Sequence, residues 1–506
     1  MILLREPGDI TWDTVQAIAY DGEAVELDSA LLARVAAGRE AFLKLIAAGV
    51  PCYGVTTGLG QLVERELDEA ERRDLPNNML RARAVATGPP LPPPVARSIL
   101  VIRLVNFLSG RDGVRAELCR FLVDRLNDGC TPWIPTLGHG MGADAVANCH
   151  AFQTFIGEGF VFGPDGAHQP ALDALASRGV APLALASKEG LALVSGVNVA
   201  PALAIHTHRR LTTLLRLANA VAAVSMEGLA APRDSVDAAL ESIHPPPGVV
   251  SIAAALRGML AASEVRVRTL QAPVSYRVVP QVHGAFLHAL AGLRQRVKDA
   301  LAGFTDNPLM VLDDSPAGGR LLSVGLFHDQ HLVNQVEQVA LALAHLGVLS
   351  ERRLHRLLNP ASSGLNPQLA PRPGLDAGLV VVQKASLDLA ARLKWLAQPV
   401  SLQVGEGSNG HEDYMAMAFP AIQRLHEMAE LADRLLVNEL LGGLVAVDQR
   451  GETPGAGVAR LRAWLREVIP PLTRDRAPGP DLERLLELVV DADFQALLPA
   501  LPEGAG

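Results

Sequence analysis

The stretch AIQRLHEMAELADRLLVNELLGGLV, residues 421–445, decides the fold, because apolar side chains recur at helical spacing along its whole length. A second stretch of the same kind, LVVVQKASLDLAARLKWLAQPVSL, covers residues 379–402. Both are too long and too apolar for a small helix on the surface, so they are typical of the long helices in a bundle. Residues 96–126 repeat the pattern with a break at Ser109-Gly110, which predicts two helices joined by a turn.

The composition agrees with helix packing on helix. Of the 506 residues, 49% are hydrophobic and only 4% aromatic, so small aliphatic side chains must fill the core. No GxGxxG motif follows a strand pattern, which excludes the usual nucleotide-binding α/β fold. We expect a mainly all-α protein that forms one folding body. Its loop-rich N-terminal part would span residues 1–200, and a helical bundle with further C-terminal helices would span residues 201–506.

Charge and short motifs exclude several functional classes. The net charge of −9 is mild and the lysines and arginines are scattered, which argues against nucleic acid as a partner. The four cysteines form no CxxC pair and no HExxH motif occurs, so no metal site is expected. The N-terminus meets charge, proline and glycine too early for a signal peptide, and no apolar run of about 20 residues would span a bilayer. We expect a cytoplasmic location without a membrane partner.

Several separate segments point to one family. They are YGVTTGLG from Tyr53, NNMLRARAVATGPPL from Asn77, KEGLALVSG from Lys188, QAPVSYRVVPQVHG from Gln271, FTDNPL from Phe304, GLFHD from Gly325 and SNGHEDYM from Ser408. In their order and spacing they resemble the aromatic amino acid ammonia-lyases, which include histidine, phenylalanine and tyrosine ammonia-lyases. The resemblance implies a central bundle of long helices of the ammonia-lyase and fumarase-like type. It also implies a homotetramer whose pockets are built from loops of three subunits.

The resemblance places the family's prosthetic-group loop at GHGMGADA, residues 138–145. In the family an Ala-Ser-Gly tripeptide cyclises and loses water to become methylidene-imidazolone (MIO), and the serine supplies the methylidene carbon. Here the matching triplet is Met141-Gly142-Ala143 or Gly142-Ala143-Asp144, and neither has a hydroxyl to eliminate. We therefore expect a degenerate loop at Gly142, Ala143 and Asp144, no MIO group and no external cofactor.

Other positions keep the residues that the family uses for catalysis. Tyr53 matches the tyrosine that acts as the catalytic base, with loop packing as the alternative role. Arg277 matches the arginine that grips the substrate carboxylate in a bidentate pair, with a structural ion pair as the alternative. Glu412 and Tyr276 complete the catalytic candidates, and Phe327 and Asn198 are further candidates for substrate binding.

At several positions that serve the MIO electrophile in the family, this chain has a different residue. Ser195 stands where the family has an asparagine that polarises the imidazolone ring, and His411 replaces a glutamine. Leu326 replaces another asparagine and Val274 a tyrosine. We keep Ser195 and His411 as substrate-binding candidates, because they still lie in the segments that would border the pocket.

Arg83 stands where many members have a histidine or an apolar residue that recognises the substrate side chain. A guanidinium in this position implies an anion. That anion is either an acidic group of the substrate or an internal carboxylate such as Glu412 or Asp144.

Three hypotheses for the function follow. The first is an enzyme that works without MIO and catalyses elimination, isomerisation or cyclisation of a small carboxylate-bearing, anionic substrate through its tyrosine and arginine. The second is a catalytically silent homologue that binds a ligand or a regulatory partner in the old pocket. The third is ordinary ammonia-lyase or aminomutase activity despite the altered loop. We expect the first, with no nucleic acid or membrane partner.

Overall fold

The computed structural model of the chain describes residues 1–140 and 143–501. The described part is mainly helical, and its strands form small two-stranded sheets, so the predicted fold class is confirmed. The three stretches with helical periodicity become four helices, and residues 96–126 form two of them as predicted. The helices are α4 (Pro93–Leu108), α5 (Ala116–Asn127), α15 (Val380–Leu396) and α16 (Ala418–Arg450).

The chain divides into two compact units, each made of separate pieces of sequence. The first unit holds residues 1–206, 294–334 and 400–423, and the second holds residues 207–293, 335–399 and 424–506. The predicted division into residues 1–200 and 201–506 stays a prediction.

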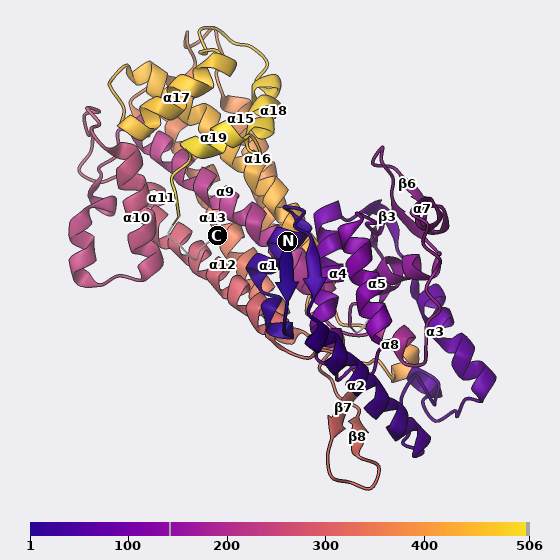
Figure 1. Cartoon of the computed structure of the whole chain (residues 1–506). Helices are drawn as coiled ribbons and strands as arrows, with labels where there is room; N and C mark the ends of the chain where they lie inside the picture. Colours follow the sequence, from indigo (N-terminus) through magenta and orange to yellow (C-terminus); the bar gives the residue numbers. More distant parts are fainter. Residues whose placement is uncertain (141–142, 502–506) are drawn as a thin grey trace. The chain divides into compact units, whose positions relative to one another are not determined.

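The first unit contains the small sheets and many short helices (Figure 1). Its strands are β1 (Ile2–Leu4), β2 (Val25–Leu27), β3 (Thr87–Pro90), β4 (Pro135–Leu137), β5 (Phe160–Phe162), β6 (His168–Pro170), β7 (Leu309–Leu312) and β8 (Gly319–Leu322). Besides α4 and α5 its helices are α1 (Trp12–Ala19), α2 (Ser29–Ala47), α3 (Glu69–Arg83), α6 (Ala145–Phe152), α7 (Ala171–Ser177) and α8 (Glu189–Val194). β1 pairs with β2 in parallel, whereas β3–β4, β5–β6 and β7–β8 are antiparallel pairs.

Helix α4 runs through the core of the first unit. Prolines open the helix, where a missing amide donor costs nothing, and it ends before Gly110, which has a positive φ of 72°. Its residues from Ile99 to Leu108 are all buried, as expected of a helix that is apolar on every side. Two of these buried residues, Arg103 and Asn106, are polar. They must therefore find partners inside the protein.

A hydrophobic cluster joins α2 to the β7–β8 hairpin. Phe42 and Leu45 of α2 pack with Cys52, Val55 and Met310, and the last of these lies in β7. The cluster fixes the segment around residue 53 and the base of the hairpin in the same part of the unit. Both segments border the cavity that is described in the next subsection.

Four long helices, α9 (Val199–Leu229), α12 (Val279–Ala302), α13 (Gln330–Leu358) and α16, have residues in both units. The second unit also contains α10 (Pro247–Leu260), α11 (Val274–Arg277), α14 (Pro360–Ser363), α15, α17 (Ala456–Val468), α18 (Gly479–Leu488) and α19 (Ala492–Leu497). Inside this unit Arg353 pairs with Glu439 in a double hydrogen bond of 2.6 and 2.8 Å, with both side chains fully buried.

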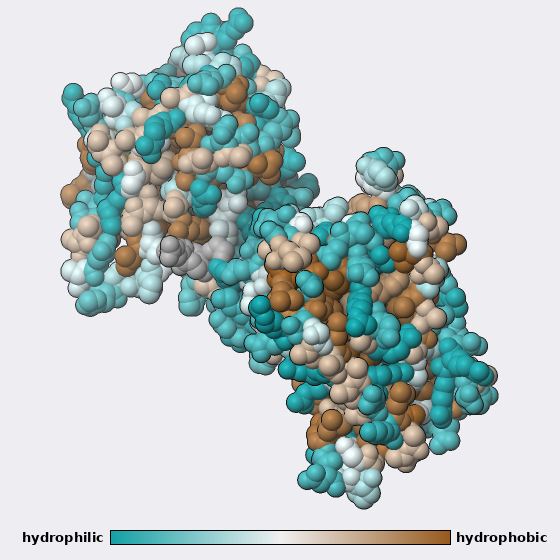
Figure 2. Space-filling model, in the orientation of Figure 1, coloured by the Kyte–Doolittle hydropathy of each residue, from teal (hydrophilic) through white to brown (hydrophobic). Residues whose placement is uncertain are grey.

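Two segments, Glu189–Leu229 and Gln330–Leu358, are long and apolar enough to cross a membrane by length and composition alone. In the first, 94% of the most apolar window is buried inside the structure, as in an ordinary core helix, so the support for a membrane span is weak. On the face shown in Figure 2, polar residues are interspersed with separate apolar patches. Within residues 1–140 and 143–501, no three histidine, cysteine or acidic side chains are grouped to hold a metal ion.

Candidate active site

A cavity of about 520 Å³ lies within the first unit. Six of the candidates predicted from the sequence line it together, namely Tyr53, Arg83, Ser195, Phe327, His411 and Glu412. Ala143, from the loop where the resemblance places the prosthetic group, lines it as well. The other walls are mainly apolar and come from Leu59, Val63, Met79, Leu191, Val194 and Val324. A mainly apolar space with a few convergent polar groups is the usual form of a small-molecule site.

Tyr53 is held by its own loop. The backbone N–H of Gly60 donates a hydrogen bond of 2.9 Å to the Tyr53 hydroxyl oxygen. Gly54 and Gly60 both have positive φ angles, and glycine adopts that conformation at little cost. The amide fixes the position of the phenol oxygen at the cavity wall.

Glu412 comes from a loop that meets the Tyr53 loop. Gly407 and Glu412 exchange two backbone hydrogen bonds of 2.8 and 3.2 Å, which close the loop into a tight turn. The side chain of Asn409 donates to Gln61, next to Gly60, so the two loops are joined directly. Phenol and carboxylate are therefore presented to one cavity by loops that support each other.

Arg83 lies in the last turn of α3, whose start is fixed by a capping box between Asp68 and Glu71. Its guanidinium donates to the Met79 carbonyl oxygen one turn earlier, at 3.3 Å. It makes no ion pair with a carboxylate of the described residues. Neither Glu412 nor Asp144 neutralises it, so this cation faces the cavity with a single backbone acceptor.

Ser195 and Asn307 form the floor on the side of α4. The Ser195 carbonyl oxygen accepts a hydrogen bond from the buried Arg103. Asn307 accepts a 2.7 Å hydrogen bond from the Val324 amide, which ties residue 307 to the end of the β7–β8 hairpin. Sequence reasoning missed Asn307 as a lining residue, although the motif FTDNPL contains it.

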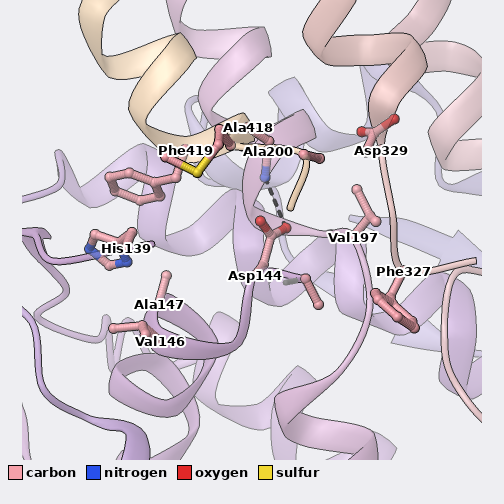
Figure 3. Close-up of a pocket in the computed structure, with 13 residues that line it drawn as sticks. His139, Asp144, Val146, Ala147, Val197, Ala200, Phe327, Asp329, Ala418 and Phe419 are labelled. Atoms are coloured by element: carbon pink, nitrogen blue, oxygen red, sulfur yellow. Dashed lines mark hydrogen bonds between the residues drawn. The ribbon is translucent and has the colours of Figure 1, made fainter. Parts of the chain in front are cut away.

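A second, much smaller cavity of about 20 Å³ adjoins the first and shares Ala143 and Phe327 with it (Figure 3). Asp144 borders it and accepts hydrogen bonds of 3.0, 2.7 and 3.1 Å from the amides of Asn198, Val199 and Ala200, at the start of α9. A carboxylate at a helix N-terminus satisfies amides that have no other acceptor. Asp144 thus anchors the end of the loop at residues 138–145. Gly142 of that loop lies outside the described residues.

Two carboxyl groups at the small cavity have raised pKa values. Burial raises the pKa of Asp144 to about 6, against the opposing effect of its three amide donors. Burial and the nearby Asp144 raise the pKa of Asp329 to about 7. Figure 3 shows the Asp329 side chain above Phe327, and one of its buried oxygens has no hydrogen-bond partner among the described residues. Asp329 is held where its charged form is disfavoured.

Asp329→Asn is therefore expected to change how stability depends on pH. Between about pH 4 and pH 7 the folded protein keeps a proton that the unfolded chain has already released, so wild-type stability falls as the pH rises through that window. Asparagine carries no charge and avoids this loss. At pH 8 the variant should gain on the order of 2–3 kcal/mol relative to wild type, compared with the difference at pH 4.5. Denaturant unfolding at both pH values measures it, and equal differences would contradict the prediction.

Three candidates do not line either cavity. Asn198 is buried, and its side chain donates to the Ile99 carbonyl and to Asn148 at 3.2 and 2.8 Å. Tyr276 and Arg277 belong to the second unit. The Tyr276 hydroxyl donates to the Arg353 carbonyl at 2.9 Å, and burial raises its pKa well above the usual value. The half-buried Arg277 donates through Nε to the Ala272 carbonyl at 2.9 Å.

Comparisons of the sequence and of the structure with known proteins all find lyases of one family. The family model described as "Aromatic amino acid lyase" matches residues 10–467. Histidine ammonia-lyase of Deinococcus radiodurans is 34% identical over 523 residues, covering 99% of this chain and 98% of the relative. The crystal structure of ergothionase, the ergothioneine-degrading enzyme of Treponema denticola, superimposes with a TM-score of 0.92 at 26% identity, over 98% and 99% of the two chains. Histidine ammonia-lyase of Trypanosoma cruzi gives a TM-score of 0.87 at 27% identity, over 100% and 96%.

These relatives correct two predictions. The hypothesis of an enzyme that works without MIO is wrong, because the relatives that span nearly the whole chain are histidine ammonia-lyases and favour the ammonia-lyase hypothesis. The expectation that no cofactor is used is wrong for the same reason, since such relatives imply the MIO group. Both predictions were based on the lack of a serine hydroxyl in the loop, although the other motif segments of the chain match the family.

The described residues of the loop at 138–145 are held in place as a site for the MIO group would require, but they do not supply the atoms of that group. Ala143 reaches the large cavity, and Asp144 is fixed at the start of α9. Residues 138–140 and 143–145 contain no serine, so they do not fit as the source of the methylidene carbon. What this chain contributes to chemistry at the cavity is therefore derived from its side chains.

Proposed function

The chain belongs to the aromatic amino acid lyase family, and on that premise we propose that it is an ammonia-lyase acting on a small amino acid. Such an enzyme removes the α-amino group and a hydrogen from the β-carbon, and it leaves an unsaturated acid and ammonia. The observation that carries the proposal is the cavity of the first unit, which a phenol, a guanidinium and a carboxylate line together. These are the groups that a proton transfer on a zwitterionic substrate requires.

We assign the proton transfer to Tyr53 and the binding of the substrate ammonium to Glu412. The Tyr53 oxygen, at a position set by the Gly60 amide, acts in its deprotonated form and accepts the β-hydrogen as a proton. The electrons of that C–H bond form the C=C bond, and the amine leaves with the electrons of the C–N bond. The Glu412 carboxylate holds the substrate ammonium in the ground state and orients the bond that breaks. The apolar lining from Leu191, Val194 and Phe327 keeps water from competing for these groups.

Two arginines are assigned to the anionic end of the substrate. Arg277 lines neither cavity of its own protomer, so we assign it to the α-carboxylate only within the proposed homotetramer, where the resemblance implies that Tyr53 and Arg277 of one site come from different subunits. Arg83 binds a second acidic group on the substrate side chain, and this assignment is supported because no carboxylate among the described residues pairs with Arg83. Ser195 and His411 line the same cavity and contact the substrate through their polar atoms. Tyr276 and Asn198 act indirectly, by supporting the elements that surround them.

We further propose a divergent prosthetic-group loop in this chain. The triplet at residues 141–144 diverges from Ala-Ser-Gly. Intact mass is the direct readout of a prosthetic group there, because cyclisation and dehydration remove water from the chain. The protein is also proposed to be a cytoplasmic homotetramer, as the resemblance implies.

A substrate panel tests the function. Purified protein is incubated with each of the common L-amino acids and with ergothioneine, and the released ammonium or trimethylamine and the unsaturated acid are quantified by chromatography. We expect one substrate to give equal amounts of amine and unsaturated acid. Absence of both products from every substrate, with a correctly folded protein by circular dichroism, would overturn the proposal.

Arg83→Met is expected to raise KM for that substrate by roughly 10–100-fold with kcat nearly unchanged, because a hydrogen bond to a charged group contributes about 1.5–3 kcal/mol. Arg81→Met is the matched control. Arg81 lies on the same helix, is exposed and pairs with Glu158 instead. Initial-rate kinetics on both variants decide the matter. An unchanged KM in Arg83→Met would exclude the guanidinium from substrate binding.

A further inference from the structure

Four charged side chains are buried together beneath the cavity, and the chemistry proposed above does not use them. They are Arg103 of α4, Asp112 from the following turn, Lys188 just before α8, and Asp306. We call them the buried charge cluster. The side chains of Arg103, Asp112 and Asp306 have no exposed surface, and that of Lys188 is 2% exposed.

Each of the two cations lies close to both aspartates. The Lys188 ammonium lies 3.0 Å from Asp306 Oδ2 and 3.3 Å from Asp112 Oδ1. Arg103 Nη2 lies 3.6 Å from an oxygen of each aspartate. Two cations thus face two aspartate side chains in a region without exposed surface, where electrostatic interactions are strong. Burial and the neighbouring Asp306 raise the pKa of Asp112, whereas Lys188 and the hydrogen bond with Asp112 lower the pKa of Asp306.

The cluster holds α8 at both ends. Lys188 is the residue before the first turn and adopts a positive φ of 77°. Arg103 donates to the carbonyl oxygens of Ala192 and Ser195 at the other end. These carbonyls belong to the last turn, where no amide of the helix itself can reach them. Leu191, Val194 and Ser195 of this segment line the cavity.

The cluster also holds the opposite floor segment. Asp306 Oδ1 accepts a 2.7 Å hydrogen bond from the Asn307 amide, and Asn307 lines the cavity and binds the Val324 amide. Next to Asp306, the Thr305 hydroxyl accepts hydrogen bonds from the Val197 amide and from Asn106 of α4, at 3.1 and 3.0 Å. Three cavity-lining segments that are distant in sequence are therefore tied to one another through Asp306 and its neighbours.

A buried ion cluster is a poor means of stabilising a fold. Its desolvation cost offsets most of its attraction, and apolar replacements of similar volume are often neutral or better. Its directional contacts fix geometry instead. We propose that the buried charge cluster is a positioning device for the reaction: it sets the backbone at Ser195 and Asn307, and so the shape of the substrate site. The catalytic part of this inference rests on the proposed function, whereas the structural part does not.

The main test is the charge-balanced double variant Lys188→Met/Asp112→Asn. It removes the Lys188 cation and the acidic group of Asp112, and it leaves Arg103 and Asp306 as one cation and one carboxylate that neutralise each other. Hydrogen–deuterium exchange of residues 191–198 and 305–307 is expected to become at least about 10-fold faster, while the Tm stays close to wild type. With the substrate found in the panel, kcat should fall about 10²-fold with a smaller change in KM, as expected when reacting groups are misplaced by about 1 Å.

Two further variants keep the test decisive if the double variant is unstable. Lys188→Arg keeps the charge and both acceptors, and should restore most of the protection from exchange and most of the kcat. Gly196→Ala displaces Arg103 without changing any charge, because the added Cβ would lie 2.2 Å from Arg103 Nη1 at a φ of 107°. It should reproduce the faster exchange at residues 305–307, which lie outside the substituted segment.

The control is Arg466→Met/Asp448→Asn, which removes an ion pair of the second unit and should leave exchange at residues 191–198 unchanged. Wild-type exchange in these segments for both the double variant and Gly196→Ala would overturn the positioning role. If wild-type protein releases no amine from any substrate, the proposed function fails, and the exchange data alone still decide whether the cluster fixes the floor.

Discussion

Tyr53→Phe is expected to lower kcat by roughly 10²–10⁴-fold, the usual contribution of a general base, while KM changes little. The variant removes one oxygen atom and keeps the ring, so the cavity retains its shape. The Gly60 amide loses its acceptor, but it lies in a part-buried loop where water can replace the phenol. Steady-state kinetics with the substrate from the panel provide the measurement.

Tyr20→Phe is the control for this variant. Tyr20 ends α1 in the same unit and shares a 3.3 Å hydrogen bond with His206, and it does not line the cavity. It should keep wild-type kcat. Equal loss of activity in both variants, or none in Tyr53→Phe, would show that the phenol oxygen is not the base.

Glu412→Gln is expected to lower kcat/KM by roughly 10–150-fold, because the substrate ammonium loses its charged acceptor, and a hydrogen bond to a charged group contributes about 1.5–3 kcal/mol. Most of the change should appear in KM, since the carboxylate is proposed to hold the substrate ammonium before reaction. Glutamine has the same shape, so the loop should keep its backbone hydrogen bonds between Gly407 and residue 412.

Glu406→Gln controls for the loss of a charge in the same loop. Glu406 is exposed and does not line the cavity. Its substitution should leave KM unchanged. If raising the ionic strength removed the effect of Glu412→Gln, the carboxylate would act through long-range attraction and not through direct contact.

The sequence was sufficient for the fold and for much of the cavity lining. The helical periodicity of residues 421–445 depends on local spacing alone, and α16 contains the whole stretch. Tyr53, Arg83 and Glu412 could be grouped because the motifs around them occur in the order of a known family. The structure gathers these three side chains in one unit.

Three features of the site were missed or wrongly predicted from the sequence: the buried charge cluster, the role of Asn198 and the cofactor. The buried charge cluster is drawn from four separate segments, so no local pattern reveals it, although an arginine within SILVIRLVNFL was a signal that a buried partner must exist. Asn198 lies in a motif segment, yet its amide is used inside the protein. The cofactor prediction gave one missing hydroxyl more weight than the similarity of the entire chain.

The central claim is that this chain eliminates an amine from an amino acid with Tyr53 as the base. The most direct measurement uses substrate that carries deuterium at the β-carbon, and compares wild type with Tyr53→Phe. The account predicts that wild type forms unsaturated acid and amine in equal amounts, that the acid has lost one deuterium, and that both products nearly disappear in the variant. Amine release without an unsaturated acid, or equal rates in both proteins, would contradict it.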